Sequence, residues 1–287
     1  SGKAEEVKFM IQESKADTVI FNHNLSPSQE RNLEKYFSTR IFDRTALILL
    51  IFAKRAKSHE GKLQVELAQL DHLSTRLIKG WSHLERQKGG IGVRGGPGEK
   101  QLELDRRMLK LRIKQLKEKL DKLKRQRTMQ RKKRSRSGAL NISIVGYTNA
   151  GKSTLFNQLT HANALAMNQL FATLDTTSRK LFIEDGVECV ISDTVGFIKA
   201  LPTTLIEAFK STLEESREAD LLLHVVNMAN PNHHEQIKAV NKILEEIKAA
   251  SIPQILVLNQ IDRLDIKANH EKDEYGRIST IQLSAKT

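Results

Sequence analysis

The chain has 287 residues, of which 39% are hydrophobic and 28% are charged, enough to build globular cores in about two or three domains. Its longest apolar run, residues 46–53, is far shorter than the roughly 20 residues of a membrane-spanning helix, so we expect no membrane span. Cys189 is the only cysteine, which excludes an internal disulfide and favours a cytoplasmic protein.

Residues 1–58 alternate helical and extended patterns. Helices are predicted at residues 4–14 and 45–57, and short strands at residues 18–21 and 41–42. The pair Ser26-Pro27 is typical of a helix start, with a capping serine followed by proline at the first helical position. This pattern predicts an α/β N-terminal domain. Because it opens on a helix and shows two strands only, we expect the domain to be partial.

Residues 59–137 are predicted to form a helical hairpin. Apolar residues repeat with 4,3 spacing along segments 63–84 and 102–123, so each segment collects them on one helix face. Six glycines lie at positions 89–98 between these segments. Two helices joined by a connection of about a dozen residues are expected to fold back antiparallel. Packing of the leucines on a neighbouring domain is the alternative. The glycine-rich connection is either a shaped tip or a plain flexible connector.

The net charge of +13 comes from the second helix of this hairpin. Sixteen Lys and Arg but only two acidic residues lie between positions 106 and 136. Such a density is typical of contact with a polyanion, and a solvated helix face is the alternative.

Residues 138–287 alternate strands and helices. Strands are predicted at 141–146, 189–191, 221–226 and 255–258, and helices at 203–217 and 235–250. Such alternation predicts an α/β domain with a mostly parallel sheet and helices on both faces.

Residues 146–153, Gly-Tyr-Thr-Asn-Ala-Gly-Lys-Ser, match the phosphate-binding pattern GxxxxGK[ST] between a predicted strand and a predicted helix. Backbone N–H groups of this turn and the helix N-terminus would bind phosphate oxygens. Lys152 would reach the β and γ phosphates, and the Ser153 hydroxyl would bind Mg²⁺.

Two later segments favour guanine over adenine. Asn259-Gln260-Ile261-Asp262 follows a predicted strand directly, and Ser284-Ala285-Lys286 lies near the end of the chain. The Asp262 carboxylate can accept two hydrogen bonds from guanine N1 and N2, whereas adenine offers no matching pair. We therefore expect GTP and GDP as ligands.

Asp193-Thr194-Val195-Gly196 ends another predicted strand. We expect Asp193 to hold Mg²⁺ through water and the Gly196 N–H to contact the γ-phosphate. Thr173 in FATLD is expected to close onto Mg²⁺, with Thr176 and Thr177 as alternatives.

The segments GYTNAGKSTLFN, FATLD, DTVGFI, NQID and SAK resemble those of the Obg–HflX group of translation-factor-like GTPases. The segments SGKAEE, LSPSQERNLE, KLQVELAQL, GGIGVRGGPGE and QLELDRR are similar to the HflX family within that group, and the similarity covers essentially the whole chain. The glycine-rich loop followed by QLELDRR is peculiar to that family.

This resemblance implies a P-loop GTPase that hydrolyses GTP to GDP and phosphate, slowly by itself and faster on the ribosome. It implies association with the large ribosomal subunit, with the hairpin tip directed toward the peptidyl-transferase centre, and a role in ribosome splitting or recycling, stress response or biogenesis. We expect a monomer. The expected contacts with ribosomal RNA are Arg94, Lys100, Arg106, Arg107, Lys114, Lys117, Lys124 and Arg125.

Two residues bear on the rate of hydrolysis. Phe197 lies where many GTPases have a glutamine that orients the attacking water, which predicts slow intrinsic turnover. Asn149 lies where related GTPases hold a potassium ion beside the transferring phosphoryl group, so K⁺ is a candidate cofactor beside Mg²⁺. A hydrogen bond that stabilises the turn is the alternative role of Asn149.

The chain departs from the family's pattern in four ways. Gln260 replaces a lysine that stacks near guanine and ribose, which bears on nucleotide affinity but not on base choice. Thr176 follows FATLD in place of proline. The tip RGGPGEK has one more glycine than usual, with Lys100 in place of threonine. The chain is also expected to begin inside its first domain and to stop before the last helix of the GTPase domain.

The predicted nucleotide-binding residues are Gly146, Tyr147, Thr148, Asn149, Ala150, Gly151, Lys152, Ser153, Thr154, Phe171, Ala172, Thr173, Leu174, Asp175, Asp193, Thr194, Val195, Gly196, Asn259, Gln260, Ile261, Asp262, Ser284, Ala285 and Lys286. The predicted metal ligands are Ser153, Thr173 and, through water, Asp193, and the predicted catalytic residues are Asn149, Lys152, Thr173 and Gly196.

Two other functions stay open. One is a nucleotide-regulated RNA-binding assembly scaffold with negligible turnover, for which Phe197 and Gln260 leave room. The other is an ATPase acting on RNA through the N-terminal domain, against which Asp262 argues for the GTPase domain.

Overall fold

The computed structural model describes residues 2–87, 97–136, 138–161, 171, 173–183, 187–199, 202, 205 and 209–286, with the backbone alone for residues 77–87, 97–102, 130–136 and 210–212. The chain folds as two compact units. The first unit joins residues 1–54 with 63–119, and the second joins residues 55–62 with 120–287. The predicted division into three domains, with its boundaries, stays a prediction.

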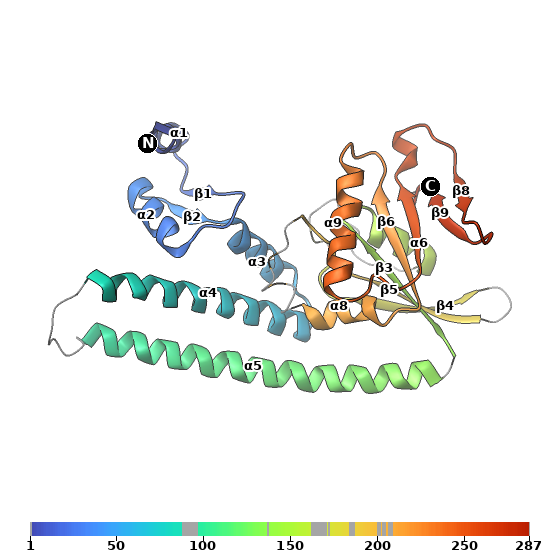
Figure 1. Cartoon of the computed structure of the whole chain (residues 1–287), viewed down its shortest axis with the longest axis horizontal. Coiled ribbons are helices and arrows are strands. Elements are labelled where there is room, and N and C mark those ends of the chain that lie inside the picture. The colour runs from blue at the N-terminus through green and yellow to red at the C-terminus, as the bar shows by residue number, and fades with distance from the viewer. Residues whose placement is uncertain are drawn as a thin grey trace. The chain divides into compact units, whose positions relative to one another are not determined.

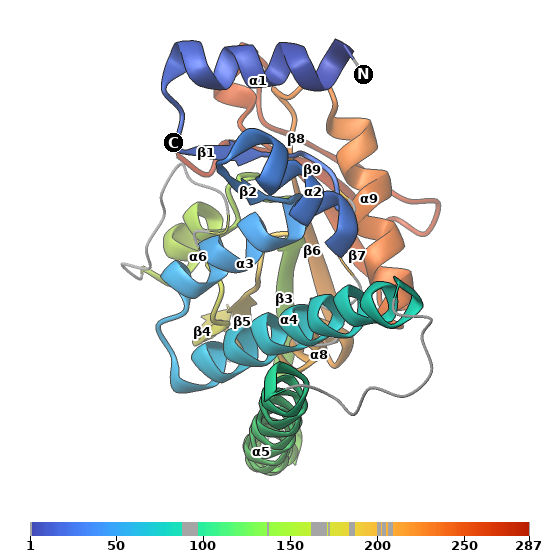
Figure 2. The same cartoon turned by 90° about the vertical axis from the view of Figure 1, so that its left-hand side faces the viewer.

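The first unit opens with a small α/β arrangement. Its elements are α1 (Gly2–Ser14), β1 (Thr18–Ile20), α2 (Pro27–Phe37), β2 (Arg40–Phe42) and α3 (Arg44–Arg55). Strands β1 and β2 are parallel, and α2 packs beside β2 (Figure 2). Helix α2 begins where the sequence predicts, because the Ser26 side chain accepts a hydrogen bond from the Gln29 N–H and the Gln29 side chain accepts one from the Ser26 N–H.

Two long helices form the predicted hairpin. They are helix α4 (His59–Gln87) and helix α5 (Pro97–Arg136), and their residues 63–87 and 97–119 belong to the first unit. The two helices run antiparallel there (Figure 1), and Arg112 of α5 pairs with Glu66 of α4 at 2.6 Å. Leu116 is fully buried, whereas the residues on either side of it are exposed, which fits the predicted apolar face of α5. The glycine-rich tip, residues 88–96, lies outside the described residues.

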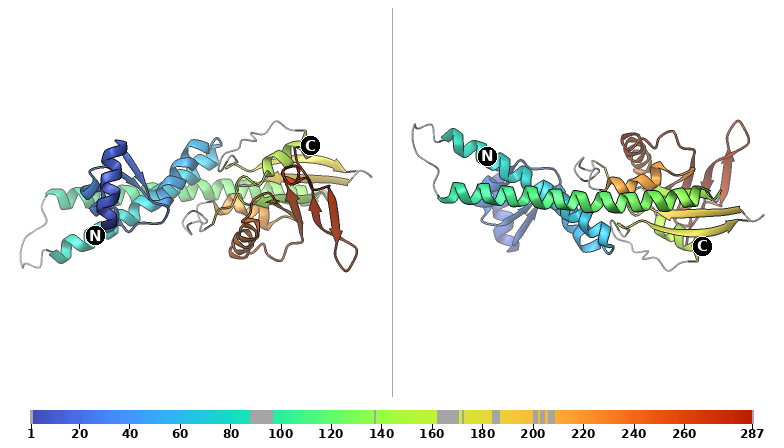
Figure 3. Two further views of the ribbon diagram at one scale, coloured as in Figure 1. Left: turned by 90° about the horizontal axis from the view of Figure 1, so that it is seen from above. Right: turned by 90° about the horizontal axis from the view of Figure 1, so that it is seen from below.

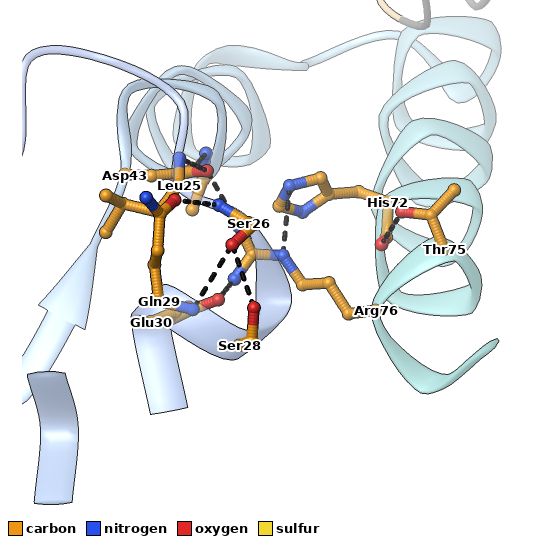
Figure 4. A network of polar contacts seen from close by, with 10 residues as sticks. Leu25, Ser26, Ser28, Gln29, Glu30, Asp43, His72, Thr75 and Arg76 are labelled. Carbon is orange, nitrogen blue, oxygen red and sulfur yellow. Dashed lines mark hydrogen bonds and ion pairs between the residues drawn. The ribbon is translucent and has the colours of Figure 1, made fainter. Parts of the chain in front are cut away.

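A cationic side chain ties α4 to the N-terminal elements (Figure 4). The Arg76 guanidinium pairs with Glu30 at the start of α2 and with Asp43, which precedes α3, at 2.7 Å from Asp43 Oδ2. The Asp43 side chain is 2% exposed and also accepts hydrogen bonds from the Leu25 and Ala46 N–H groups. Because a buried carboxylate is costly without such partners, this network fixes the position of α2 and α3 on α4.

The second unit is built on a sheet of seven strands in the order β4-β5-β3-β6-β7-β9-β8. The strands are β3 (Leu140–Gly146), β4 (Thr177–Ile183), β5 (Val187–Asp193), β6 (Leu221–Asn227), β7 (Gln254–Asn259), β8 (Asn269–Lys272) and β9 (Ile278–Gln282). Strands β5, β3, β6, β7 and β9 are mutually parallel. At the two edges, β4 and β8 pair antiparallel with β5 and β9, and Figure 3 shows these edge pairs in yellow and red.

Helices cover both faces of this sheet (Figure 1). They are α6 (Lys152–Thr160), α8 (Lys210–Arg217) and α9 (His233–Glu246), with a short 3₁₀ helix η2 (Ile261–Arg263) after β7. Ile144 of β3 packs with Phe156 of α6, whereas the next residue, Val145, packs with Leu213 of α8 and Leu244 of α9. Because successive strand side chains point to opposite faces, α6 covers one face and α8 and α9 cover the other. The predicted fold class is confirmed.

Strand β6 buries a histidine. His224 is 2% exposed, and burial, followed by the charge of Lys152, lowers its pKa to about 4. Its Nε2 is buried with no hydrogen-bond partner in the described structure. The folded protein therefore keeps this imidazole neutral at a pH where an unfolded chain protonates it.

We expect His224 to make the second unit sensitive to acid. The unfolded chain binds a proton near pH 6.5 and the folded one only near pH 4, so the free energy of unfolding falls as the pH drops between these values, by on the order of 3 kcal/mol. His224→Leu should flatten this part of the stability profile, measured by urea denaturation at several pH values. His270→Leu, at an exposed position on β8, is the matched control and should keep the wild-type slope. Equal slopes in both variants would contradict the assignment.

Candidate nucleotide site

The turn after β3 has a backbone shaped to surround an anion. Asn149 and Gly151 have φ angles of 62° and 94°, and a Cβ on Gly151 would collide with the Asn259 side chain. Helix α6 begins at the next residue, and Gly151 at its N-cap has no side chain that could accept a hydrogen bond from the first backbone N–H groups. The N–H groups at this helix start are therefore available to phosphate oxygens.

Lys152 places a buried cation at this turn. Its side chain is 6% exposed, and Nζ donates a hydrogen bond to the Tyr147 carbonyl at 3.0 Å. Burial lowers the pKa of Lys152 to about 8, whereas the charge of Asp193 raises it. A Cβ on Gly196 would lie 2.9 Å from Lys152 Nζ, so glycine leaves room for the lysine here. A desolvated ammonium of this kind gains most from an anionic ligand such as a phosphate.

Three side-chain oxygens converge beside Lys152. Ser153 Oγ lies 2.7 Å from Thr173 Oγ1, and both hydroxyls donate to Asp193 Oδ2, at 2.7 and 3.0 Å. Burial raises the pKa of Asp193, while Lys152, the two hydroxyls and the Thr194 N–H lower it. Asp193 Oδ1 is buried without a hydrogen-bond partner in the described structure. An oxygen-only set with a buried, under-satisfied carboxylate fits Mg²⁺, and this geometry favours Thr173 over Thr176 and Thr177 as its ligand.

Asn259 links the loops on the base side of the site. Its Nδ2 donates to the Ala150 carbonyl and its Oδ1 accepts from the Ala285 N–H, both at 2.9 Å. Gln260 has a φ of 67° and donates to the Asn149 carbonyl at 3.4 Å. Asp262 follows in η2 with an exposed side chain, so its carboxylate can accept hydrogen bonds from a base that enters from solvent.

These loops enclose a cavity of about 250 Å³. The predicted residues that line it are Thr148, Asn149, Gly151, Lys152, Ser153, Thr154, Phe171, Thr173, Thr194, Gly196, Asn259, Gln260, Asp262, Ser284, Ala285 and Lys286. Arg263 also lines it, and no motif in the sequence points to this residue. The structure therefore brings the predicted phosphate, metal and base segments to one place.

Some predicted site residues do not line the cavity. They are Gly146, Tyr147, Ala150, Leu174, Asp175, Asp193, Val195 and Ile261. Asp193 nevertheless contacts the lining hydroxyls, whereas the Asp175 carboxylate contacts the start of α4. Ala172 lies outside the described residues.

Phe197 is enclosed by apolar neighbours. It is 1% exposed and packs in the cluster that includes Leu213 and Val240. Its backbone hydrogen bonds with Gly146 and Thr148 hold it beside the phosphate turn. A side chain in this place cannot orient a water molecule, which agrees with the expectation of slow hydrolysis.

The predicted RNA contacts on α5 differ in their surroundings. Arg107, Lys114, Lys117 and Arg125 are exposed, and Arg106 is half-buried. Lys124 instead pairs with Glu214 of α8 at 2.5 Å, and that glutamate side chain is 4% exposed. This ion pair gives Lys124 a structural role within the second unit. Arg94 and the side chain of Lys100 lie outside the described residues.

Three family models match the chain. Their descriptions read GTP-binding GTPase N-terminal, GTP-binding GTPase Middle Region and 50S ribosome-binding GTPase, and they match residues 1–53, 55–134 and 141–260. GTPase HflX of Escherichia coli strain K12 is 54% identical over the whole of this chain and 67% of its own length. The chain belongs to the HflX family of GTPases. This confirms the resemblance found in the sequence.

Other curated members of the HflX family give the same picture. GTPase HflX of Magnetococcus marinus is 48% identical over 100% of this chain and 66% of its own, and that of Alkalihalophilus pseudofirmus is 52% identical over 91% and 62%. The chain thus spans about two thirds of the length of these relatives. A solved GTP-binding protein from Sulfolobus solfataricus in complex with GDP aligns with 99% of this chain and 79% of its own at 25% identity, with a TM-score of 0.49, too low to place individual residues.

None of the helices described is long and apolar enough to cross a bilayer. Within the same residues, no group of three or more His, Cys, Asp or Glu side chains could hold a metal ion.

Asp262 generates a test of base recognition. Asp262→Asn replaces an acceptor of two hydrogen bonds with an amide that can donate to the 2-oxygen of xanthine, so GTP affinity should fall by about a hundredfold and xanthosine triphosphate affinity should rise. Calorimetric titration with both nucleotides measures the switch. Asp265→Asn, at an exposed position three residues on, is the matched control and should bind GTP as the wild type does. Unchanged GTP affinity in Asp262→Asn would rule out this role.

Proposed function

We propose that this chain binds and hydrolyses GTP and that it does so in association with the large ribosomal subunit. The observation that carries the proposal is the convergence of three elements on one cavity: the phosphate turn with Lys152, the oxygens of Ser153 and Thr173 beside Asp193, and Asp262 on the base side. Membership of the HflX family supports the same reaction.

In this proposal each group of the site has a part in hydrolysis. The N–H groups of the turn and Lys152 bind and polarise the phosphates, and Asp262 selects the guanine base. Ser153, Thr173 and, through water, Asp193 would hold Mg²⁺, which neutralises phosphate charge when bound. The Gly196 N–H would contact the γ-phosphate. A potassium ion beside Asn149 would add positive charge there, and equal rates in potassium and sodium buffers would exclude it.

Ribosome association rests on the family and on α5. The family model that covers residues 141–260 is described as a 50S ribosome-binding GTPase, and the exposed cations Arg107, Lys114, Lys117 and Arg125 can meet RNA phosphates. The proposal includes a monomer that acts in the cytoplasm, with the tip of the hairpin near the peptidyl-transferase centre. Ribosome splitting or recycling, stress response and biogenesis are the roles this contact would serve.

A scaffold with negligible turnover is the second candidate, and the buried Phe197 favours it. The rate of phosphate release in the presence of large ribosomal subunits distinguishes the two functions. If the chain is a GTPase activated by its partner, purified large subunits should accelerate steady-state phosphate release by on the order of a hundredfold or more, because ordering the site replaces the missing water-positioning group. A scaffold would bind subunits and GTP with no such acceleration. Small subunits serve as the control for nonspecific RNA.

The exposed cations of α5 predict a salt dependence. Replacing Lys114 and Lys117 together by glutamine should reduce the slope of log affinity against log salt by about one for each RNA phosphate that the helix can no longer neutralise. Cosedimentation with large subunits across a salt series measures the slope, and GTP affinity should stay unchanged. Lys238→Gln with Lys242→Gln, on exposed positions of α9, removes the same charge elsewhere and should leave the slope as it is. Identical slopes in both double variants would contradict an RNA contact through α5.

A further inference from the structure

Asp175 joins the predicted metal site to the start of a helix far away in sequence. Its Oδ2 accepts hydrogen bonds from the N–H groups of Lys57, at 2.9 Å, and Ser58, at 2.7 Å, and its Oδ1 accepts from Ser58 Oγ at 2.5 Å. Ser58 Oγ in turn accepts a hydrogen bond from the Gly61 N–H at 2.8 Å, so Ser58 is the N-cap residue of α4. The carboxylate thus lies at the N-terminus of α4, where the helix dipole favours negative charge.

The first turn of α4 is shaped for this carboxylate. A Cβ on Gly61 would overlap Asp175 Oδ1 and would lie 3.1 Å from Ser58 Oγ. Glycine in a helix costs roughly 1 kcal/mol relative to alanine, so its presence in the first turn calls for a local reason. The close approach of Asp175 supplies one.

Only one residue separates this contact from the metal site. Thr173 Oγ1 lies 2.7 Å from Ser153 Oγ and 3.0 Å from Asp193 Oδ2, and Leu174 between the two contacts is 3% exposed. Two residues of chain span at most about 7 Å, so the segment cannot move at one end without changing the other. Thr173, Asp175 and residues 55–62 all belong to the second unit.

We infer that Asp175 is a positioning residue that couples nucleotide state to α4. Its contact with Lys57, Ser58 and the first turn of α4 holds Thr173 where it can contact Mg²⁺ beside a γ-phosphate. GDP lacks that phosphate and gains less from an ordered Thr173, so the contact strengthens triphosphate binding selectively. The inference rests on the proposed function, because it concerns the same nucleotide site.

Thermodynamic linkage makes the coupling reciprocal. If the contact between Asp175 and α4 favours the triphosphate state, then the triphosphate stabilises the start of α4 by the same factor. A partner that orders α4 would likewise favour an ordered Thr173. The hairpin helix and the metal site would then respond to each other without direct contact between nucleotide and helix.

The experiment compares two nucleotides in three variants. Asp175→Asn, Ser58→Ala and the double variant are titrated with a non-hydrolysable GTP analogue and with GDP, both with Mg²⁺. Asp175→Asn should weaken the analogue on the order of tenfold while GDP affinity stays within twofold. Ser58→Ala should weaken the analogue less, because the backbone N–H groups of Lys57 and Ser58 still donate to Asp175. The double variant should be no weaker than Asp175→Asn, because the Ser58 hydroxyl acts through Asp175. Asp265→Asn is the charge-matched control and should leave both affinities unchanged.

Hydrogen exchange supplies a readout that a purely structural cap would not move. In the wild type, amides of residues 57–62 should exchange more slowly with the analogue than with GDP, and this difference should vanish in Asp175→Asn. Variants that keep the wild-type ratio of affinities, or that weaken both nucleotides equally, would overturn the inference and leave the proposed function standing. A wild type that binds no guanine nucleotide would remove both.

Discussion

The second unit depends on a buried carboxylate that its own chain does not fully satisfy. Asp193 ends β5 with one oxygen held by the hydroxyls of Ser153 and Thr173 and the other without a partner among the described residues. Burial opposes its negative charge, and the nearby Lys152 ammonium, itself desolvated, compensates only in part. Such a pair gains most when a divalent cation and an anionic phosphate enter together. The site therefore fits a nucleotide bound together with a divalent cation better than either component alone.

The sequence could reveal three parts of the site because each is formed by a few consecutive residues. They are the phosphate turn, the metal carboxylate and the base segment. Glycine at 151 is needed within its own turn, and Asp193 follows directly from a buried strand. The central strands could also be predicted from the sequence, because strands of a parallel sheet covered on both faces need continuous apolar runs. Strand β4 was missed because most of its side chains are exposed and carry no such run. Strand β8 was missed for the same reason. Strand β9 was missed because Ser279 and Thr280 interrupt its apolar residues, which are half-buried or exposed.

Contacts between residues distant in sequence were beyond prediction. Asp175 was assigned to the nucleotide from its place in FATLD, yet its partners lie 117 and 118 positions earlier. Lys124 was grouped with the RNA contacts because it lies in a charge run, and nothing local reveals that Glu214 is its partner. Asn259 shows the same limit, because its motif indicates base recognition whereas its amide joins Ala150 to Ala285. Composition gives the number of charges, but only the fold decides which of them are used internally.

The roles inferred for Phe197 and Asp175 complement each other in the control of hydrolysis. A side chain that cannot orient water leaves hydrolysis dependent on the placement of other groups. Thr173 is one of these groups, and it lies two residues before Asp175. In the coupling proposed for Asp175, the rate with phenylalanine at 197 follows the order of the segment that Asp175 holds against Ser58. Low intrinsic catalysis is in this view what allows the helix to control the site.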